Sequence, residues 1–235
     1  MNIDYSKVLV ATPIRGNQTV TLYTAGMMQS AGLHGGWLPM AGQSDIYVAR
    51  NVLANEFLKR KNFDTLICID SDIGFTRQNL QDLIHSDEDL VSGLYTDKCQ
   101  PPMPFCRAND GQPVPLADIP TQGMLPARFL PGGFLKINRS VFQAIIDKGM
   151  APTYGAGAFH LFFQGRIILD NLLSEDYSFS TLCFDAGIQG WINCGIRLNH
   201  DGRTLDAQAP QPDTASLPKP VAPNQAVQDL LKATP

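Results

Sequence analysis

Short apolar runs alternate with helix-forming stretches along the first part of the chain, and this alternation constrains the fold more than any other feature. Apolar runs typical of buried strands occupy Lys7–Thr12, Thr65–Ile69 and Leu90–Leu94. Stretches with helical spacing of their apolar residues occupy Thr19–Ser30, Ile46–Lys61 and Thr76–Ser86. Strands that alternate with helices commonly form one sheet with the helices packed on its faces, so the sequence predicts an α/β domain with a mostly parallel central sheet.

The second half of the chain begins with a proline-rich segment. Eight prolines fall between positions 99 and 131, a density that excludes long helices and central strands, so we interpret this segment as an insertion. The elements expected after it are a strand at Phe134–Ile137, a helix capped by Ser140 and ending at Lys148, a mobile loop at Gly149–Gly165, a helix at Glu175–Phe184 and a strand at Trp191–Leu198. Six prolines follow position 206, which indicates a Pro/Ala-rich tail at 206–235 after a domain at 1–205.

The composition is that of an ordinary folded protein. The 235 residues carry a formal net charge of −4, so the chain as a whole is not an obvious nucleic-acid binder. The sequence has no apolar run of about 18 residues and does not open like a secretory signal, so we expect a cytoplasmic protein without membrane contact, in the host cytoplasm if it is viral. Five cysteines without a C-x-x-C pair are interpreted as reduced thiols.

Charge is unevenly distributed along the chain. Residues 62–97 hold eight acids and one base, whereas residues 98–168 hold seven bases and three acids. Chance clustering on a solvated surface explains such a pattern. The functional alternative is a basic face that receives an anionic ligand.

The strongest chemical signal is Asp70-Ser71-Asp72, which follows directly on the apolar run Thr65–Ile69. In open α/β sheets, ligands bind outside the carboxyl ends of the strands. Two carboxylates there repel each other unless a cation neutralises them, and their hard oxygen atoms suit Mg²⁺ or Mn²⁺. A polar turn that caps the next helix explains an isolated D-x-D better than a metal site does, so its companions decide the interpretation.

Several polar residues accompany this motif. His200 follows the last predicted strand. Glu175 and Asp176 begin a predicted helix, where they either favour the positive end of its dipole or supply a base and a substrate-positioning group. Arg50 can pair with a phosphate or with an acid of the D-x-D loop. The segment 12–16 opens from a strand into a loop, where a nucleotide would lie.

Taken in order, these features resemble the GT-A glycosyltransferase superfamily, especially its small stand-alone bacterial and bacteriophage members, which are family 2-like. The resemblance covers roughly residues 5–203 and rests on the segments ATPIRG, SDIYVARN, TLICIDSDIGF, SGLYTDK, GGFLKINRSVF, SEDYSF and IRLNHDG. It implies a Rossmann-like, three-layer α/β/α fold with a nucleotide-sugar half at about 1–98 and an acceptor half at about 99–205. The proline-rich segment matches none of these motifs.

The resemblance also implies a role for each residue. Asp70 and Asp72 would hold Mn²⁺ or Mg²⁺ with the ribose and diphosphate of the donor, and His200 would be the third protein ligand of the metal. The remaining implied contacts are Thr12, Pro13 and Arg15 with the base and ribose, Lys98 and Arg50 with the diphosphate, and Asp176 or Glu175 as the base that faces the acceptor. The donor expected is a UDP-sugar, the transfer inverting, and the acceptor a glycan or a hydroxymethylated DNA base.

Other classes of protein remain as alternatives. A haloacid-dehalogenase-like phosphatase also has a strand that ends in D-x-D, but its motif lies near the N-terminus and is followed by Thr or Val where this chain has Gly74. A sugar-nucleotide pyrophosphorylase needs a glycine-rich opening that this sequence lacks. The non-enzymatic alternative is a sugar- or partner-binding domain on a GT-A scaffold, against which the complete set of acids and His200 argues.

Overall fold

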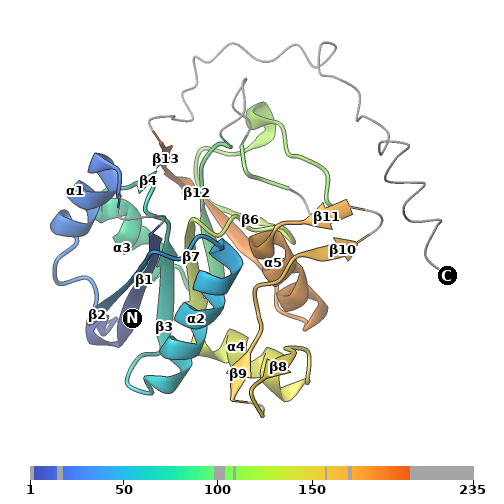
Figure 1. Ribbon diagram of the computed structural model, residues 1–235. Helices are drawn as coiled ribbons and strands as arrows, with labels where there is room; N and C mark the ends of the chain where they lie inside the picture. Colours follow the sequence, from blue (N-terminus) through green and yellow to red (C-terminus); the bar gives the residue numbers. More distant parts are fainter. Residues whose placement is uncertain are drawn as a thin grey trace. The chain divides into compact units, whose positions relative to one another are not determined.

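A seven-stranded sheet forms the centre of the fold, with its strands in the order β2-β1-β3-β7-β5-β12-β6 (Figure 1). The strands are β2 (Gly36–Ala41), β1 (Val8–Ile14), β3 (Thr65–Ile69), β7 (Phe134–Asn138), β5 (Leu90–Leu94), β12 (Trp191–Arg197) and β6 (Met124–Pro126). Five of the seven point the same way, whereas β7 and β6 run in the opposite direction. The computed structural model describes residues 3–14, 18–97, 104–107, 110–156, 158–168 and 171–201.

Helices cover both faces of this sheet. The helices α1 (Thr21–Gln29) and α3 (Arg77–His85) lie on one face, and α2 (Ile46–Lys59), α4 (Arg139–Asp147) and α5 (Glu175–Asp185) lie on the other (Figure 1). Successive side chains of a strand point to opposite faces. Val8 and Val10 of β1 therefore pack with α1 and α3, while Leu9 and Ala11 pack on the opposite side with α2, α4 and α5. This arrangement confirms the predicted three-layer α/β/α fold.

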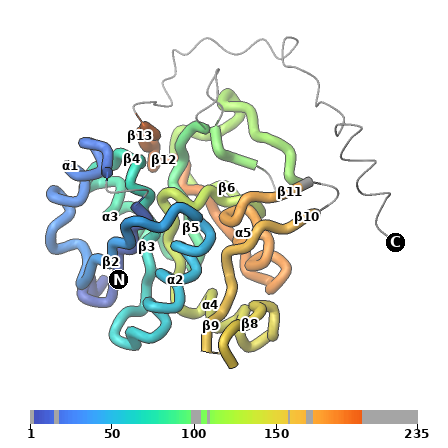
Figure 2. Tube along the Cα trace, viewed as in Figure 1, coloured from blue at the N-terminus to red at the C-terminus, as the bar shows by residue number. Residues whose placement is uncertain are grey.

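Short elements decorate the layers. These are the 3-10 helices η1 (Tyr5–Lys7) and η2 (Leu116–Asp118), the hairpins β8–β9 (Thr153–Tyr154, Phe159–His160) and β10–β11 (Arg166–Ile168, Asn171–Leu173), and the pair β4–β13 (Ile73–Gly74, Asn199–His200). The β10–β11 hairpin leads directly into α5 (Figure 2). Within the proline-rich segment, the described residues add η2 and the strand β6, which joins the sheet at its edge, where prolines are tolerated.

Two local expectations were wrong. The strand β2 was not predicted, because Gly36 and Pro39 weaken a strand signal and its side chains alternate only between half-buried and exposed. Its position at the edge of the sheet permits the proline. Ser140 does not cap α4, whose N-cap residue is Asn138; the Ser140 hydroxyl donates instead to Asp89 Oδ2 at 3.0 Å.

The segment 160–163, which lies within the Gly149–Gly165 loop predicted to be mobile, is hydrogen-bonded to α2. Asn51 Oδ1 accepts from the backbone N–H groups of Phe162 and Phe163 at 2.8 and 2.9 Å, and its Nδ2 donates to Phe163 O at 2.6 Å. One helical turn later, Asn55 exchanges hydrogen bonds with the backbone of His160 at 2.8 and 2.9 Å. Both phenylalanines are consequently buried in the core.

Some expectations fall on residues that the structure does not describe. Arg15, Lys98 and the tail 206–235 lie outside the described ranges. Within those ranges, no helix is long and apolar enough to cross a membrane. The described cysteines are buried free thiols, namely Cys68, Cys106, Cys183 and Cys194.

Candidate active site

Polar side chains gather where the carboxyl ends of β3, β5 and β12 meet. Asp70 and Asp72 follow β3, and the backbone N–H of Asp70 donates to Gly133 O at 2.9 Å. Tyr95 follows β5. His200 lies beyond β12 in the short strand β13, which pairs with β4 and so places His200 opposite Ile73. Pairing between the short strands β4 and β13 thus brings His200 beside the D-x-D loop, although the two are distant in the sequence.

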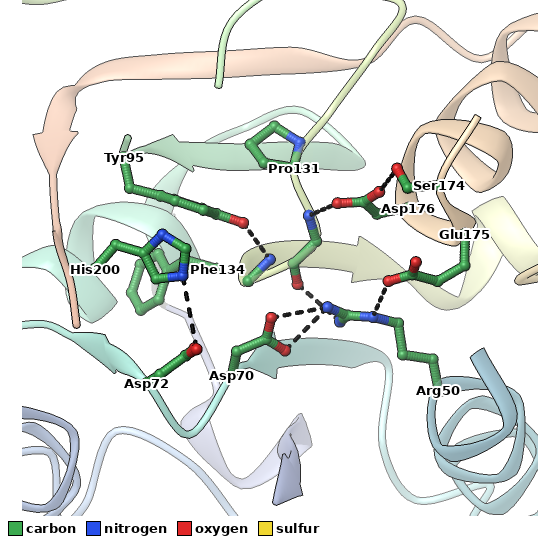
Figure 3. Close-up of polar contacts among 12 residues, drawn as sticks. Arg50, Asp70, Asp72, Tyr95, Pro131, Phe134, Ser174, Glu175, Asp176 and His200 are labelled. Atoms are coloured by element: carbon green, nitrogen blue, oxygen red, sulfur yellow. Dashed lines mark hydrogen bonds and ion pairs between the residues drawn. The ribbon is translucent and has the colours of Figure 1, made fainter. Parts of the chain in front are cut away.

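Arg50 lies at the centre of this group (Figure 3). Its Nη2 donates to both carboxylate oxygens of Asp70 at 2.9 Å, and its Nε donates to Glu175 Oε1 at 3.2 Å. Its Nη1 donates to Gly132 O at 2.9 Å. Only 3% of the Arg50 side chain is exposed. Of the two partners considered for Arg50 from the sequence, the structure pairs it with the acid of the D-x-D loop.

Burial and charge act against each other on this ion-paired group. Burial alone would lower the pKa of the Arg50 guanidinium, but the carboxylates of Asp70 and Glu175 raise it above its usual value. Burial raises the pKa of Asp70, and Asp72 and Asp176 raise it further, while Arg50 opposes both effects. Burial likewise raises the pKa of Glu175 against the pull of Arg50. Pairing with Arg50 therefore opposes the effect of burial on the pKa of both acids.

Asp176 has structural partners on both of its oxygens. Its Oδ2 accepts from the backbone N–H of Gly132 at 3.0 Å, while its Oδ1 accepts from the Ser174 hydroxyl and from Tyr177 N at 2.8 Å. A Cβ atom added at Gly132 would lie 2.9 Å from Asp176 Cβ and 3.0 Å from Arg50 Cζ. The turn before β7 can therefore approach these side chains only because glycine occupies this position.

Gly133 and Tyr95 complete the turn. The backbone N–H of Gly133 donates to the Tyr95 hydroxyl oxygen at 2.7 Å, and a Cβ atom at Gly133 would lie 2.6 Å from that oxygen. Burial raises the pKa of Tyr95 well above its usual value, and the nearby Asp70 and Asp176 add to this, so the phenol stays protonated. Tyr95, Gly132 and Gly133 lie in the segments SGLYTDK and GGFLKINRSVF, which carry the resemblance, but no role was predicted for them. The signal available for a role was their position at strand ends on the same edge as Asp70.

His200 presents one ring nitrogen to Asp72. Its Nδ1 lies 2.6 Å from Thr96 O, and a carbonyl can only accept, so Nδ1 carries a proton. Its Nε2 lies 3.6 Å from Asp72 Oδ2 (Figure 3). A backbone carbonyl that fixes the tautomer in this way is typical of histidines that bind metals through the other nitrogen.

The residues present fit a divalent cation in part. Asp72 is one-third exposed, and its carboxylate faces Nε2 of His200, so a hard oxygen and an imidazole nitrogen converge. Asp70 lies on the same loop, but each of its oxygens already accepts from Arg50. Among the described residues, no group of three or more His, Cys, Asp or Glu side chains is arranged as a metal site. Asp72 and His200 are therefore the better-placed ligands of the three predicted.

A pocket of about 260 Å³ opens beside the D-x-D loop. It is lined by Pro13, Ile14, Gln43, Ser44, Ile46, Ala49, Asp70, Ser71 and Asp72. Pro13 lines it as expected, and Gln43 and Ser44 were not anticipated. Thr12 lies behind it: the fully buried Thr12 hydroxyl pairs with the Tyr23 hydroxyl at 2.7 Å and accepts from Trp37 Nε1 at 3.1 Å.

Comparison with known proteins gives a relationship in structure alone. No family model and no curated protein sequence matches the chain. The crystal structure of A197 from STIV superposes with a TM-score of 0.53 at 15% identity, covering 81% of this chain and 84% of A197. The chain shares its fold with A197. A glycosyltransferase involved in the glycosylation of the major capsid of PBCV-1 gives a TM-score of 0.32 at 8% identity, over 60% of this chain and 63% of that one, too weak a likeness to carry an argument.

Proposed function

We propose that the protein is a metal-dependent glycosyltransferase that moves a sugar from a nucleoside-diphosphate sugar to an acceptor hydroxyl. The observation that carries the proposal is the position of Asp70 and Asp72, which form one wall of the pocket beside β1. Asp70 also faces Arg50, and Asp72 faces His200. A ligand in that pocket would have its polar end at the acids. A nucleotide fits this arrangement, with its base in the pocket and its diphosphate at a cation held near the acids.

The donor would lie with its base and ribose between Pro13, Ile14 and Gln43, and with its diphosphate toward Asp72. Asp72 and His200 would hold Mn²⁺ or Mg²⁺, and Asp70 would orient the loop between them. When bound, the cation stabilises the negative charge that develops on the leaving diphosphate. A UDP-sugar is the donor proposed, and the acceptor would approach from the side of α5.

Glu175 is the better candidate for the base that removes the acceptor proton. It meets Arg50 through one oxygen, Oε1, and burial raises its pKa, which strengthens it as a proton acceptor. Asp176 accepts from three donors through its two oxygens, so its carboxylate is engaged in holding the 131–133 turn and the start of α5. We therefore assign Glu175 the role of base and Asp176 the role of positioning the 131–133 turn. A base on the face opposite the leaving group would give inversion.

Substitution by amides separates these two roles. Glu175→Gln should reduce transfer by about 10²–10⁴-fold while UDP binding is retained, because the base is lost and the volume is kept. Asp176→Asn should lower thermal stability, because an amide cannot accept all three bonds. Steady-state kinetics and isothermal titration with UDP measure both. Full activity in Glu175→Gln would place the base elsewhere.

The decisive test of the function is binding that depends on the metal. The melting temperature should rise with UDP and Mn²⁺ together and change little with either one alone, because ligands that bind only the folded state stabilise it. A panel of nucleotide sugars with Mn²⁺, read by release of nucleoside diphosphate, then identifies the donor. The proposal would be refuted if UDP raised the melting temperature equally with and without EDTA and no donor were turned over.

The contacts of Asp70 argue against the phosphatase alternative. In that chemistry the first acid of D-x-D attacks phosphorus and needs a free oxygen. Here both oxygens of Asp70 accept from Arg50 at 2.9 Å. Phosphatase substrates added with Mg²⁺ should therefore release no phosphate.

The buried positions of Lys136 and of three phenylalanines favour a glycan over DNA as the acceptor. Within segment 98–168, Lys136 is 5% exposed and donates to the carbonyls of Ile84 and Ser86. Phe134, Phe162 and Phe163 belong to the core, so they offer no stacking surface for bases.

Transfer to oligosaccharides should therefore exceed transfer to hydroxymethylated DNA at low and at moderate salt. Phosphate contacts would make binding to DNA fall steeply with salt. Unmodified DNA is the control for transfer to the hydroxymethyl group. Labelling of hydroxymethylated DNA alone would reverse this preference for a glycan.

A further inference from the structure

The buried guanidinium of Arg50 joins two parts of the candidate site that are distant in sequence. Arg50 lies on α2, Asp70 follows β3, and Glu175 begins α5. The side chain bonds the carboxylates of both acids and the carbonyl of Gly132, and each of its three nitrogens donates at 3.2 Å or less. These three partners belong to the D-x-D loop, the α5 terminus and the 131–133 turn.

The surroundings fix Arg50 in this position. Gly132 lies against the guanidinium so closely that a Cβ atom there would be 3.1 Å from Nη2. Asp176 holds Gly132 from the other side through its backbone N–H. For a phosphate to take Arg50, the Asp70 pair would have to break and leave a carboxylate without its cation, which is costly in a buried position.

We propose that Arg50 is a positioning residue that holds Asp70 and Glu175 in their relative places, and that it does not bind the donor diphosphate. This inference rests on the proposed function in its catalytic part, because it assumes that Asp70 serves the donor side and Glu175 the acceptor side. Its structural part, the charge coupling through Arg50, holds whatever the protein catalyses.

The shape of arginine explains why this position needs it. A guanidinium is a planar fork that meets two acids and a carbonyl in one plane at fixed directions. An ammonium carries the same charge as a point at the end of a flexible stem. Lysine at position 50 would therefore keep the positive charge but would not hold Asp70, Glu175 and Gly132 in fixed directions.

A double-variant cycle on thermal stability tests the coupling without any assay of activity. Arg50→Met should lower the melting temperature by on the order of 10 °C, because it leaves two partly buried acids without their cation. Arg50→Met combined with Glu175→Gln should melt above Arg50→Met alone, since one of those acids is then neutral. A double variant that melts at or below Arg50→Met would show that Arg50 contributes packing only and would overturn the proposal.

Arg50→Lys tests the geometry and stands in where Arg50→Met does not fold. Its kcat should fall by about 10²-fold, because a misplacement of about 1 Å costs that much, while KM for the donor and the affinity for UDP with Mn²⁺ stay near wild type. A large loss of UDP affinity with kcat retained would make Arg50 a diphosphate ligand and refute the inference.

Arg139→Lys is the matched control. Arg139 is also engaged through its whole guanidinium, but its partners are the backbone carbonyls of Phe57, Leu58, Arg60 and Phe63. It should melt earlier than wild type and keep its kcat. If wild type turns over no nucleotide sugar, the proposed function fails, and the stability cycle still decides the coupling on its own.

Discussion

Arg50 and Arg139 lie at opposite ends of the parallel strands of the central sheet, Arg50 at the carboxyl end and Arg139 at the amino end. Their hydrogen-bond partners differ in kind. At the carboxyl end, Arg50 meets two carboxylates and one carbonyl. At the amino end, Arg139 meets only backbone carbonyls, at the end of α2 and in the loop before β3, and lies over the ring of Phe57 at 4.3 Å. Burial lowers the pKa of Arg139, whereas the carboxylates raise the pKa of Arg50 above its usual value.

This difference separates a structural cation from one that belongs to a site. The last carbonyls of a helix lack partners and attract a cation, so Arg139 completes α2 and its role ends there. The carboxylates that pair with Arg50 come from two separate elements, the loop after β3 and the first turn of α5. Keeping several acids together under partial burial costs stability, and such clusters commonly mark functional sites. Substitutions at the carboxyl end test whether that end is functional throughout.

The largest effect is expected at Asp72. Asp72→Ala should reduce transfer by about 10³-fold or more, because the proposed metal, which would supply several kcal/mol to the transition state, would lose a ligand. The melting temperature should change little, since the Asp72 side chain is one-third exposed. Initial rates at saturating donor and differential scanning calorimetry measure the two quantities. Near-wild-type rates at saturating donor would show that the carboxyl end does not use Asp72 for catalysis.

His200 should give the next largest effect. His200→Ala should raise the Mn²⁺ concentration for half-maximal activity by about 10–100-fold, because Nε2 would no longer join Asp72 at the cation. The control is His85→Ala, whose ring bonds the Tyr5 hydroxyl on an exposed part of the surface. A metal titration that coincides with wild type would leave His200 as a packing residue between Tyr95 and Phe105.

The fold was largely readable from the sequence because its signals are local. The boundaries of β3 and β5 match the prediction, since each is an apolar run between polar residues. The same reasoning missed β2, whose place is decided by pairing with β1 and not by its own propensity.

The site was readable only in part. Asp70 and Asp72 follow a strand, whereas Glu175 and Asp176 begin a helix, and the sequence shows both positions. The ion pairs of Arg50 join positions 20 and 125 residues apart, and such distances carry no local signal. The sequence left open whether Arg50 meets a phosphate or an acid, and only the packing of α2 against the 131–133 turn and α5 decided it. The burial of Thr12 depends in the same way on Tyr23 and Trp37.

An intermediate effect, on the free energy of unfolding, is expected where the 131–133 turn contacts Tyr95. Gly133→Ala should lower the free energy of unfolding by about 1–3 kcal/mol, because its Cβ would lie 2.6 Å from the Tyr95 hydroxyl and 3.2 Å from Asp70 Oδ2. Activity should fall with it, since Asp70 would move. Gly195→Ala is the control: its Cβ meets nothing closer than Asn193 Oδ1 at 3.4 Å, so it should change stability by less than about 0.5 kcal/mol. Equal urea midpoints for the two variants would contradict the close packing of this turn.

The smallest effect on function is expected at Thr12. It lies near the carboxyl end of β1, but its substitution should lower stability and leave donor binding nearly unchanged. Thr12→Val removes a buried hydroxyl that bonds Tyr23 and Trp37, so the free energy of unfolding should fall by about 1–2 kcal/mol. The affinity for UDP with Mn²⁺ should change by less than about twofold, because Thr12 lies behind the pocket wall formed by Pro13 and Ile14. Thr65→Val is the matched control at the amino end, where the hydroxyl donates to Asn138 Oδ1 at 2.9 Å. Urea unfolding and calorimetric titration should then give the same pattern for both variants. A tenfold loss of UDP affinity in Thr12→Val alone would show that the Thr12 hydroxyl contributes to donor binding. The donor site would then include a residue that lies behind the wall formed by Pro13 and Ile14.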